Sequence, residues 1–423
     1  MAGLVLVGTV AGTAGAQTGS VPGVTDKTVK IGFISSETGV ASETSKGSID
    51  ACKARIGRAN AEGGVNGRKI EVEYVDDQSG PGNLDIAKDL VQNRNVFAVV
   101  NDSALAFFAY RYLVAQGVPV VGGGFDGTYY YDKGNESIIS GLGGGSPVPG
   151  LTFDIGGQVM KKLGGTKVGA VGYGISPSSS ENAQAVYQYG GPAQGLKSTY
   201  INKTVDFGST DVGPVVLGIK NSGADALWLP LNPATNLAII QGLQQNGAQM
   251  KAVLSATGYG QSLLDSPAAQ SLTSQDVFLT GFRPVELGGK AIKQMQADRK
   301  KYTNKTGVPE WGEYTGYVDC DIVIKGLEGA GKDLTRKGFV DAIRNAGTYD
   351  VAGLTCQPYD FSLANYGKVA SSYCQWAVIV DKGKFKVLNN GKPYVGKLVG
   401  PPDLVAQYTT NSGGVTATTV AGG

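Results

Sequence analysis

A glycine-rich stretch offers the first candidate chemistry in this chain. Val118 to Val121 has the character of a strand and runs directly into Gly122-x-Gly124-x-x-Gly127. Dinucleotide-binding proteins use this glycine spacing to bring a pyrophosphate against the start of a helix. The following TYYYDKGNESI is a poor first turn for a helix, and no strand ends in an acidic residue near residue 147. We therefore predict no nucleotide cofactor, and the glycines form either a structural turn or a loop that lines a ligand site.

The absence of histidine removes most other catalytic chemistry. None of the 423 residues is His, so a Ser-His-Asp triad, a Cys-His pair and an HExxH zinc site are all excluded. The net charge is +2, and no basic run is interleaved with aromatic residues, which argues against a nucleic-acid partner. We expect a protein that is not an enzyme and that carries no cofactor or metal.

The N-terminal segment predicts export. GLVLVGTVAGTAGAQ is a short apolar run that ends in the cleavage pattern Ala14-Gly15-Ala16. It is too short to span a bilayer, and no Cys precedes Cys52, so no lipid-modified cysteine is expected near the N-terminus. We predict a signal peptide and linker over residues 1–26 and a secreted or cell-envelope protein.

The four cysteines suit an oxidising compartment. Three pairings are possible, and the local one joins Cys356 to Cys374, which leaves Cys52 to pair with Cys320. Four buried free thiols are the alternative. No CxxC spacing occurs, so neither zinc nor thioredoxin-like chemistry is indicated.

The elements that must position any site alternate between strand and helix. Strand-like segments such as VKIGFI and VFAVVN alternate with helical ones, and the pattern restarts after a glycine-rich stretch at 140–150. This predicts an α/β protein of two lobes, each a parallel sheet with helices on both faces, joined by three crossovers. The predicted divisions are 27–147 plus 284–352 for lobe 1, 148–283 plus 353–400 for lobe 2, and a disordered tail over 401–423.

Several segments resemble one family. VKIGFISSETG, EGGVNGRKIEVEYVDD, AQGVPVVG and GEYTGYVDCDIVIKGLEGAG are similar to the type I periplasmic binding proteins of the Leu/Ile/Val-binding class, over residues 27–390. These are the solute receptors of ABC importers. The resemblance implies a monomer whose cleft closes on one small molecule and presents it to an ABC permease, without catalysis. A ligand-sensing module with the same fold is the alternative.

Ligands of such sheets bind at the carboxyl ends of strands, so the loops that follow strands are the candidate site. In lobe 1, the hydroxyl of Ser103 and the amides from Ala104 onward suit a ligand carboxylate. The loop after the fourth strand allows close backbone approach at its glycines and offers an apolar wall and a charge. Its candidate residues are Gly123, Gly124, Phe125 and Asp126.

Lobe 2 supplies four further candidates. Tyr173 and Tyr259 are expected to line or stack on the ligand, and Asn232 follows a strand. Arg283 has the guanidinium geometry to grip a carboxylate, although a surface or hinge salt bridge explains it equally well.

One departure from the family bears on the ligand. Amino-acid binders place an acid after the strand that corresponds to KAVLSA, to hold the ammonium, and this chain has Thr257-Gly258-Tyr259 there. An unpaired ammonium in a closed cleft is costly. Either Asp102 or Asp126 replaces the missing acid, or the ligand lacks an amino group. Branched-chain or other amino acids, amides, and aromatic or aliphatic carboxylates therefore stay open as ligands.

Overall fold

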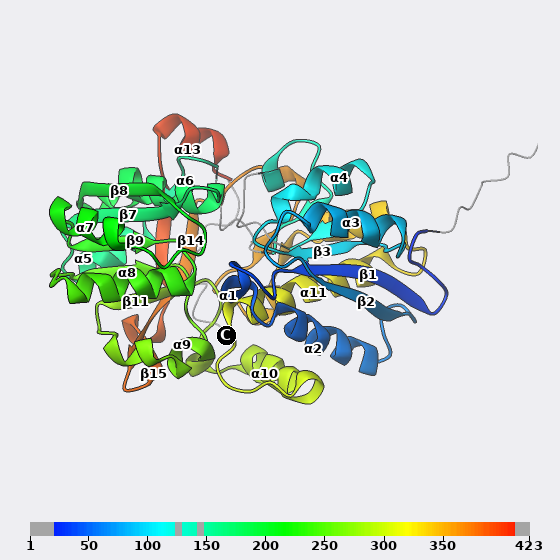
Figure 1. The fold of residues 1–423 in the computed structure, drawn as a ribbon. Coiled ribbons are helices and arrows are strands. Elements are labelled where there is room, and N and C mark those ends of the chain that lie inside the picture. The colour runs from blue at the N-terminus through cyan, green and yellow to red at the C-terminus, as the bar shows by residue number, and fades with distance from the viewer. Residues whose placement is uncertain (1–20, 123–128, 142–147, 411–423) are drawn as a thin grey trace, which may run out of the picture.

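The structure of the chain is a computed structural model that describes residues 21–122, 129–141 and 148–410. These residues form two lobes, each with a sheet packed between helices (Figure 1). The predicted fold class is confirmed. The signal peptide predicted for the first residues lies almost entirely outside the described part of the chain.

The sheet of the first lobe has five parallel strands in the order β2-β1-β3-β4-β5. Its strands are β1 (Thr28–Ser35), β2 (Lys69–Asp76), β3 (Val99–Asp102), β4 (Val120–Val121) and β5 (Ile138–Ile139). Ile31 and Phe33 of β1 pack in the core shared with α2 (Ser48–Ala61) and α11 (Trp311–Ala330). Ile34 packs in the core shared with α3 (Asn83–Gln92) and α4 (Tyr110–Ala115). Both faces are therefore covered, as the apolar strand sequences predict.

Seven α-helices belong to the described part of the first lobe. They are α1 (Ser42–Ser45), α2 (Ser48–Ala61), α3 (Asn83–Gln92), α4 (Tyr110–Ala115), α10 (Lys290–Thr303), α11 (Trp311–Ala330) and α12 (Arg336–Asn345). A short pair of strands, β12 (Thr348–Tyr349) and β13 (Tyr359–Asp360), lies on the way back to the second lobe.

The sheet of the second lobe is mixed, with the order β6-β16-β14-β11-β10-β9-β7-β8 and β15 paired to β14. Its strands are β6 (Thr152–Phe153), β7 (Lys167–Tyr173), β8 (Lys197–Val205), β9 (Ala226–Leu229), β10 (Ala252–Ser255), β11 (Asp276–Thr280), β14 (Ser372–Asp381), β15 (Lys384–Val387) and β16 (Tyr394–Val399). Strands β7 to β11 are parallel, whereas β14, β15, β16 and β6 pair antiparallel. The predicted parallel sheet is confirmed for β7 to β11, whereas the strands that follow α12 pair antiparallel. The difference arises because the chain returns after α12 and adds its last strands to the sheet edge as hairpins.

Helices cover both faces of this mixed sheet. α5 (Ile155–Lys162) and α6 (Pro177–Ala185) pack on one face, and α7 (Gly213–Ser222) and α8 (Pro233–Gln245) on the other. α9 (Gln261–Asp265) and α13 (Pro402–Tyr408) complete the lobe. The predicted disordered tail is wrong for its first part, because α13 packs on β16 and Val369 bridges Thr409.

The chain passes between the sheets three times, after β5, after β11 and after α12. The second and third connections lie side by side: the backbone amide of Arg283 donates to the carbonyl of Leu354 over 2.7 Å, and Phe282 bridges Thr355. No helix within the described ranges is long and apolar enough to cross a membrane.

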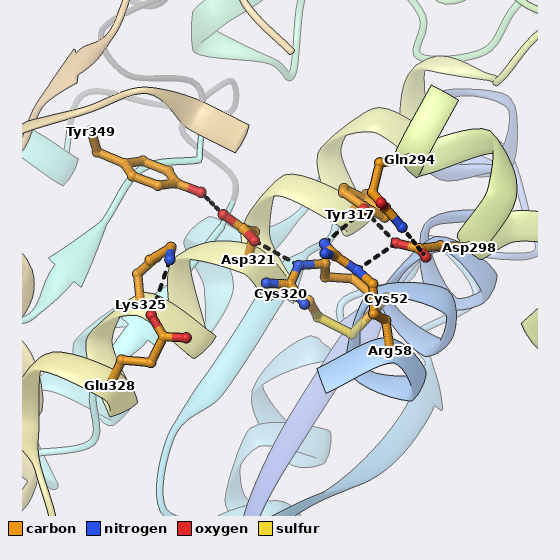
Figure 2. A network of polar contacts seen from close by, with 11 residues as sticks. Cys52, Arg58, Gln294, Asp298, Tyr317, Cys320, Asp321, Lys325, Glu328 and Tyr349 are labelled. Carbon is orange, nitrogen blue, oxygen red and sulfur yellow. Dashed lines mark hydrogen bonds and ion pairs between the residues drawn. A yellow bond between two sulfur atoms is a disulfide. The ribbon is translucent and has the colours of Figure 1, made fainter. Parts of the chain in front are cut away.

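Both predicted disulfides are present. Cys52–Cys320 joins α2 to α11, and Cys356–Cys374 joins the third connection to β14. Polar contacts surround the first bond (Figure 2): Asp298 of α10 accepts from the Tyr317 hydroxyl of α11 at 2.7 Å and pairs with Arg58 of α2 at 2.8 Å. The disulfide and this carboxylate together hold α2, α10 and α11 as one layer.

Candidate ligand-binding site

A cavity of about 240 Å³ lies where the two lobes meet. One buried water needs about 10–15 Å³ on the same measure, so this space is large enough for a small organic molecule. Thr44, Ala104 and Trp311 line it from the first lobe. The remaining walls come mainly from the carboxyl ends of β7, β9, β10 and β11, from β14, and from α5 and α6. This is the strand edge at which sheets of this kind bind ligands.

The walls are rich in aromatic rings. They include Phe153, Tyr173, Phe207, Trp228, Phe282, Trp311, Tyr359 and Tyr373. None of the cavity-lining residues in the described ranges is Asp, Glu, Lys or Arg. A ligand here meets ring faces and uncharged polar groups, and no ionic partner from those ranges.

Several polar groups in the wall are already engaged. The Tyr173 hydroxyl donates to Thr235 Oγ1 at 2.8 Å and accepts from the amide of Asn232 at 3.0 Å. Ser179 Oγ donates to the carbonyl of Pro230 at 2.6 Å, and Thr257 Oγ1 donates to the carbonyl of Leu231 at 2.7 Å. These bonds fix the loops after β7, β9 and β10 in place, so their side chains shape the wall more than they offer free hydrogen bonds.

Three of the residues proposed from the sequence line this cavity: Ala104, Tyr173 and Asn232. Asn232 acts as the N-cap of α8, since its Oδ1 accepts from the amide of Thr235 at 2.9 Å. Tyr173 packs beside Phe207 with ring centroids 4.7 Å apart, and its burial raises the pKa of its hydroxyl to about 12. Tyr173 therefore presents a ring to the cavity while its hydroxyl stays in the lobe.

Ser103 and Asp102 do not line the cavity. Ser103 is fully buried; its hydroxyl donates to Asp77 and accepts from the amide of Leu105 at 2.9 Å. Asp102 accepts from Thr315 Oγ1 at 2.8 Å with one oxygen, and burial raises its pKa to about 8. The Ser103 hydroxyl is thus a structural group of the turn after β3, and Asp102 faces α11 instead of a ligand ammonium.

Tyr259 and Arg283 also lie outside the cavity lining. The Tyr259 hydroxyl donates to Glu286 at 2.7 Å and accepts from the amide of Val285 at 2.8 Å. Arg283 Nε donates to the carbonyl of Gly288 at 3.0 Å, within the turn before α10. Both side chains stabilise the second connection between the lobes, and Arg283 does so through a backbone carbonyl and not through the predicted alternative of a salt bridge. Gly123, Gly124, Phe125 and Asp126 lie outside the described residues.

The sequence predictions missed Trp228, Tyr373 and Gln375, which also line the cavity. Trp228, whose Nε1 donates to Asn182 Oδ1 at 2.6 Å, is the next-to-last residue of β9, shortly before the loop that contains Asn232. Its position was an available signal. Tyr373 and Gln375 gave no such signal, because their place depends on β14 pairing antiparallel with β11.

Metal binding finds no support among the described residues, which contain no group of three or more Asp, Glu, Cys or His side chains placed to hold an ion.

Comparison with known proteins places the chain. A family model described as periplasmic binding protein matches residues 28–384. No curated protein matches the sequence. Among solved structures, a fatty acid ABC transporter substrate-binding protein from Thermomonospora curvata has a TM-score of 0.72 at 22% identity, covering 94% of this chain and 97% of that chain.

Two other solved structures hold named ligands. An R. palustris solute-binding protein in complex with benzoate has a TM-score of 0.69 at 14% identity, covering 85% of this chain and 95% of that one. LivJ from Streptococcus pneumoniae, in complex with isoleucine, has a TM-score of 0.67 at 20% identity and covers 86% and 99%. At these identities the likeness shows the fold, whereas the family match spans most of the chain. The chain therefore belongs to the periplasmic binding protein family and has its type I fold.

Proposed function

We propose that this solute-binding protein closes on a small carboxylate with an aromatic or aliphatic body and no ammonium group, and delivers it to an ABC permease. The observation that carries the proposal is the uncharged, aromatic-rich wall of the cavity in the described residues. A ligand ammonium would be buried there without the acid that amino-acid binders provide, at a cost of several kcal/mol.

Thr257, in the loop where amino-acid binders of the family place an acid, supports the same ligand class. Thr257 lines the cavity, and its hydroxyl is used by the Leu231 carbonyl, so it offers an incoming ammonium no negative charge. A carboxylate is less dependent on a counter-charge, because hydroxyls, amides and backbone N–H groups bind it well. The structural neighbours that hold benzoate and that transport fatty acids bind ligands of this kind.

A ligand screen tests the proposal. We expect benzoate, octanoate or a related carboxylate to raise the melting temperature and to bind with a Kd below about 1 mM, a weak affinity on the usual scale. Ala256→Trp fills the cavity at one of its lining residues and should abolish the binding, whereas Ala406→Trp on the exposed surface of α13 should not. Binding confined to amino acids would contradict the ligand class, and binding of no small metabolite would contradict the receptor function.

A further inference from the structure

Two tyrosines and one glutamine line the cavity with side-chain polar groups that have no partner among the described residues. Tyr359 of β13 and Tyr373 and Gln375 of β14 all line it, and none of their polar side-chain atoms has a hydrogen-bond partner among the described residues. Buried tyrosine hydroxyls normally find a partner. Tyr359 is only 2% exposed, so its free hydroxyl is unusual.

Strand geometry brings the two β14 groups onto one face. Side chains two residues apart on a strand point the same way, so Tyr373 and Gln375 share the face on which Ala377 packs against the core under α5 and α6. The Tyr373 ring also lies beside Phe153, with centroids 5.3 Å apart. Both groups therefore stand on a rigid sheet rather than on a loop.

The backbone beside Tyr373 leaves room for its hydroxyl. A Cβ atom added at Gly281, the residue after β11, would lie 2.7 Å from Tyr373 Oη. The glycine therefore permits the hydroxyl to reach its present position next to the cavity, and any larger residue would displace it.

The hydroxyls stay protonated and can donate. Burial raises the pKa of Tyr373 to about 12. Burial also raises the pKa of Tyr359 well above its usual value, with Tyr373 and Asp319 adding to the effect. Because no cation lines the cavity in the described residues, an acceptor oxygen of a ligand there can meet only neutral donors from those residues, and these three side chains are among them.

We propose that Tyr359, Tyr373 and Gln375 form a polar anchor for an acceptor oxygen of the ligand, a carboxylate or a carbonyl, and so determine specificity. The anchor rests on the proposed function, since it assigns the head group of the same ligand. It lies on the third connection and the antiparallel part of the sheet. The aromatic walls then take the apolar body.

The test uses probes that share a body and differ in head group. These are 3-phenylpropionate, 3-phenylpropanamide and 3-phenylpropylamine, and the same three head groups on an octyl chain. Calorimetry should show that the carboxylate or the amide binds better than the amine. Comparing the affinities of the carboxylate and amide probes then shows whether the site prefers a charged or a neutral acceptor oxygen.

Single substitutions then test the anchor. Tyr359→Phe, Tyr373→Phe and Gln375→Met should each weaken the better acceptor probe about five- to tenfold, the value of one or two hydrogen bonds. Tyr187→Phe removes a hydroxyl from the same lobe outside the cavity lining and should leave the affinity unchanged. Gly281→Ala, which displaces the Tyr373 hydroxyl, should also weaken binding and should cost much less in a Tyr373→Phe background.

The outcomes separate two failures. If the carboxylate probes bind and all three anchor variants keep wild-type affinity, the anchor is wrong and the proposed function stands. If no acceptor probe binds, or only the amine does, both are wrong. Melting temperatures of all variants, measured without ligand, identify any loss of affinity that comes from unfolding.

Discussion

The carboxylate of Glu43 in α1 accepts a hydrogen bond of 2.8 Å from the backbone amide of Ala234, in the first turn of α8. The two residues belong to different lobes. Asn232 Nδ2 adds a second contact across the same gap, to the carbonyl of Val40 at 3.4 Å. An acidic side chain at the N-terminus of a helix is favourable because that end carries partial positive charge. Glu43 therefore acts as a cap on α8 when the lobes are together.

Removing this contact should favour opening. An exposed charge at a helix N-terminus contributes about 0.3–1 kcal/mol, so we expect Glu43→Gln to weaken ligand binding about two- to fivefold, mostly through faster dissociation. Stopped-flow release of a bound carboxylate measures this. Glu328→Gln, another exposed glutamate, serves as the control. An unchanged dissociation rate in Glu43→Gln would show that the contact between Glu43 and α8 does not stabilise the closed form.

A negative charge placed in the cavity should weaken the binding of a carboxylate ligand. Thr257→Asp puts a carboxylate where the wall is uncharged, and we expect it to weaken binding of carboxylate probes at least tenfold, since it repels the ligand and lacks a partner. Thr204→Asp adds the same charge at an exposed site of the same lobe. Equal affinity of Thr257→Asp and the wild type would place the ligand elsewhere.

The buried acid Asp319 should make stability depend on pH. Both of its carboxylate oxygens are buried without a hydrogen-bond partner in the described structure. Burial raises its pKa well above the usual value, and Asp102 adds to the rise. The folded protein therefore keeps a proton on Asp319 that the unfolded chain releases above pH 3.8, so stability falls as the pH rises above that value.

Asp319→Asn should remove part of this cost. We expect its melting temperature to exceed that of the wild type at pH 7.5, by about 2–4 °C for each kcal/mol recovered in a lobe-sized unit. The gain should disappear as the pH falls well below 3.8, where the aspartate is protonated in both the folded and the unfolded state. Scanning calorimetry at several pH values, with Asp403→Asn on α13 as the exposed control, checks this. A gain that does not change with pH would show that Asp319 is not the titrating group.

The two disulfides should differ in how much they stabilise the folded protein. Cys52–Cys320 closes a separation of 268 residues and Cys356–Cys374 one of 18. Because longer closed loops restrict the unfolded chain more, we expect Cys52→Ala/Cys320→Ala to lose more stability than Cys356→Ala/Cys374→Ala, with about 3 kcal/mol for the shorter loop. Urea unfolding followed by circular dichroism measures both. Equal midpoints for the double variants and the wild type would contradict a stabilising role.

The fold could be predicted because its signals are local. Strand runs such as VKIGFI in β1 carry their own pattern, and the Gly63-Gly64 stop follows α2 closely. The disulfide pairing followed from the short spacing of Cys356 and Cys374. These features need no knowledge of distant contacts.

The site was harder to predict because its residues meet through distant pairing. Ala104, Tyr173 and Asn232 follow or end parallel strands, and the rule for such sheets located them. Tyr373 and Gln375 reach the cavity only because β14 joins the sheet antiparallel. Tyr259 and Arg283 also follow strands, but hydrogen bonds within the hinge turn them away, and the sequence alone carries no sign of those bonds.

The most direct test compares ligands that differ only by the ammonium group. Calorimetric titrations of leucine against 4-methylpentanoate, and of phenylalanine against 3-phenylpropionate, keep the body and the carboxylate constant. An uncharged cavity wall predicts that the member without the ammonium binds at least about tenfold more tightly in at least one pair. Tighter binding of the amino acid in both pairs would contradict the proposed ligand class.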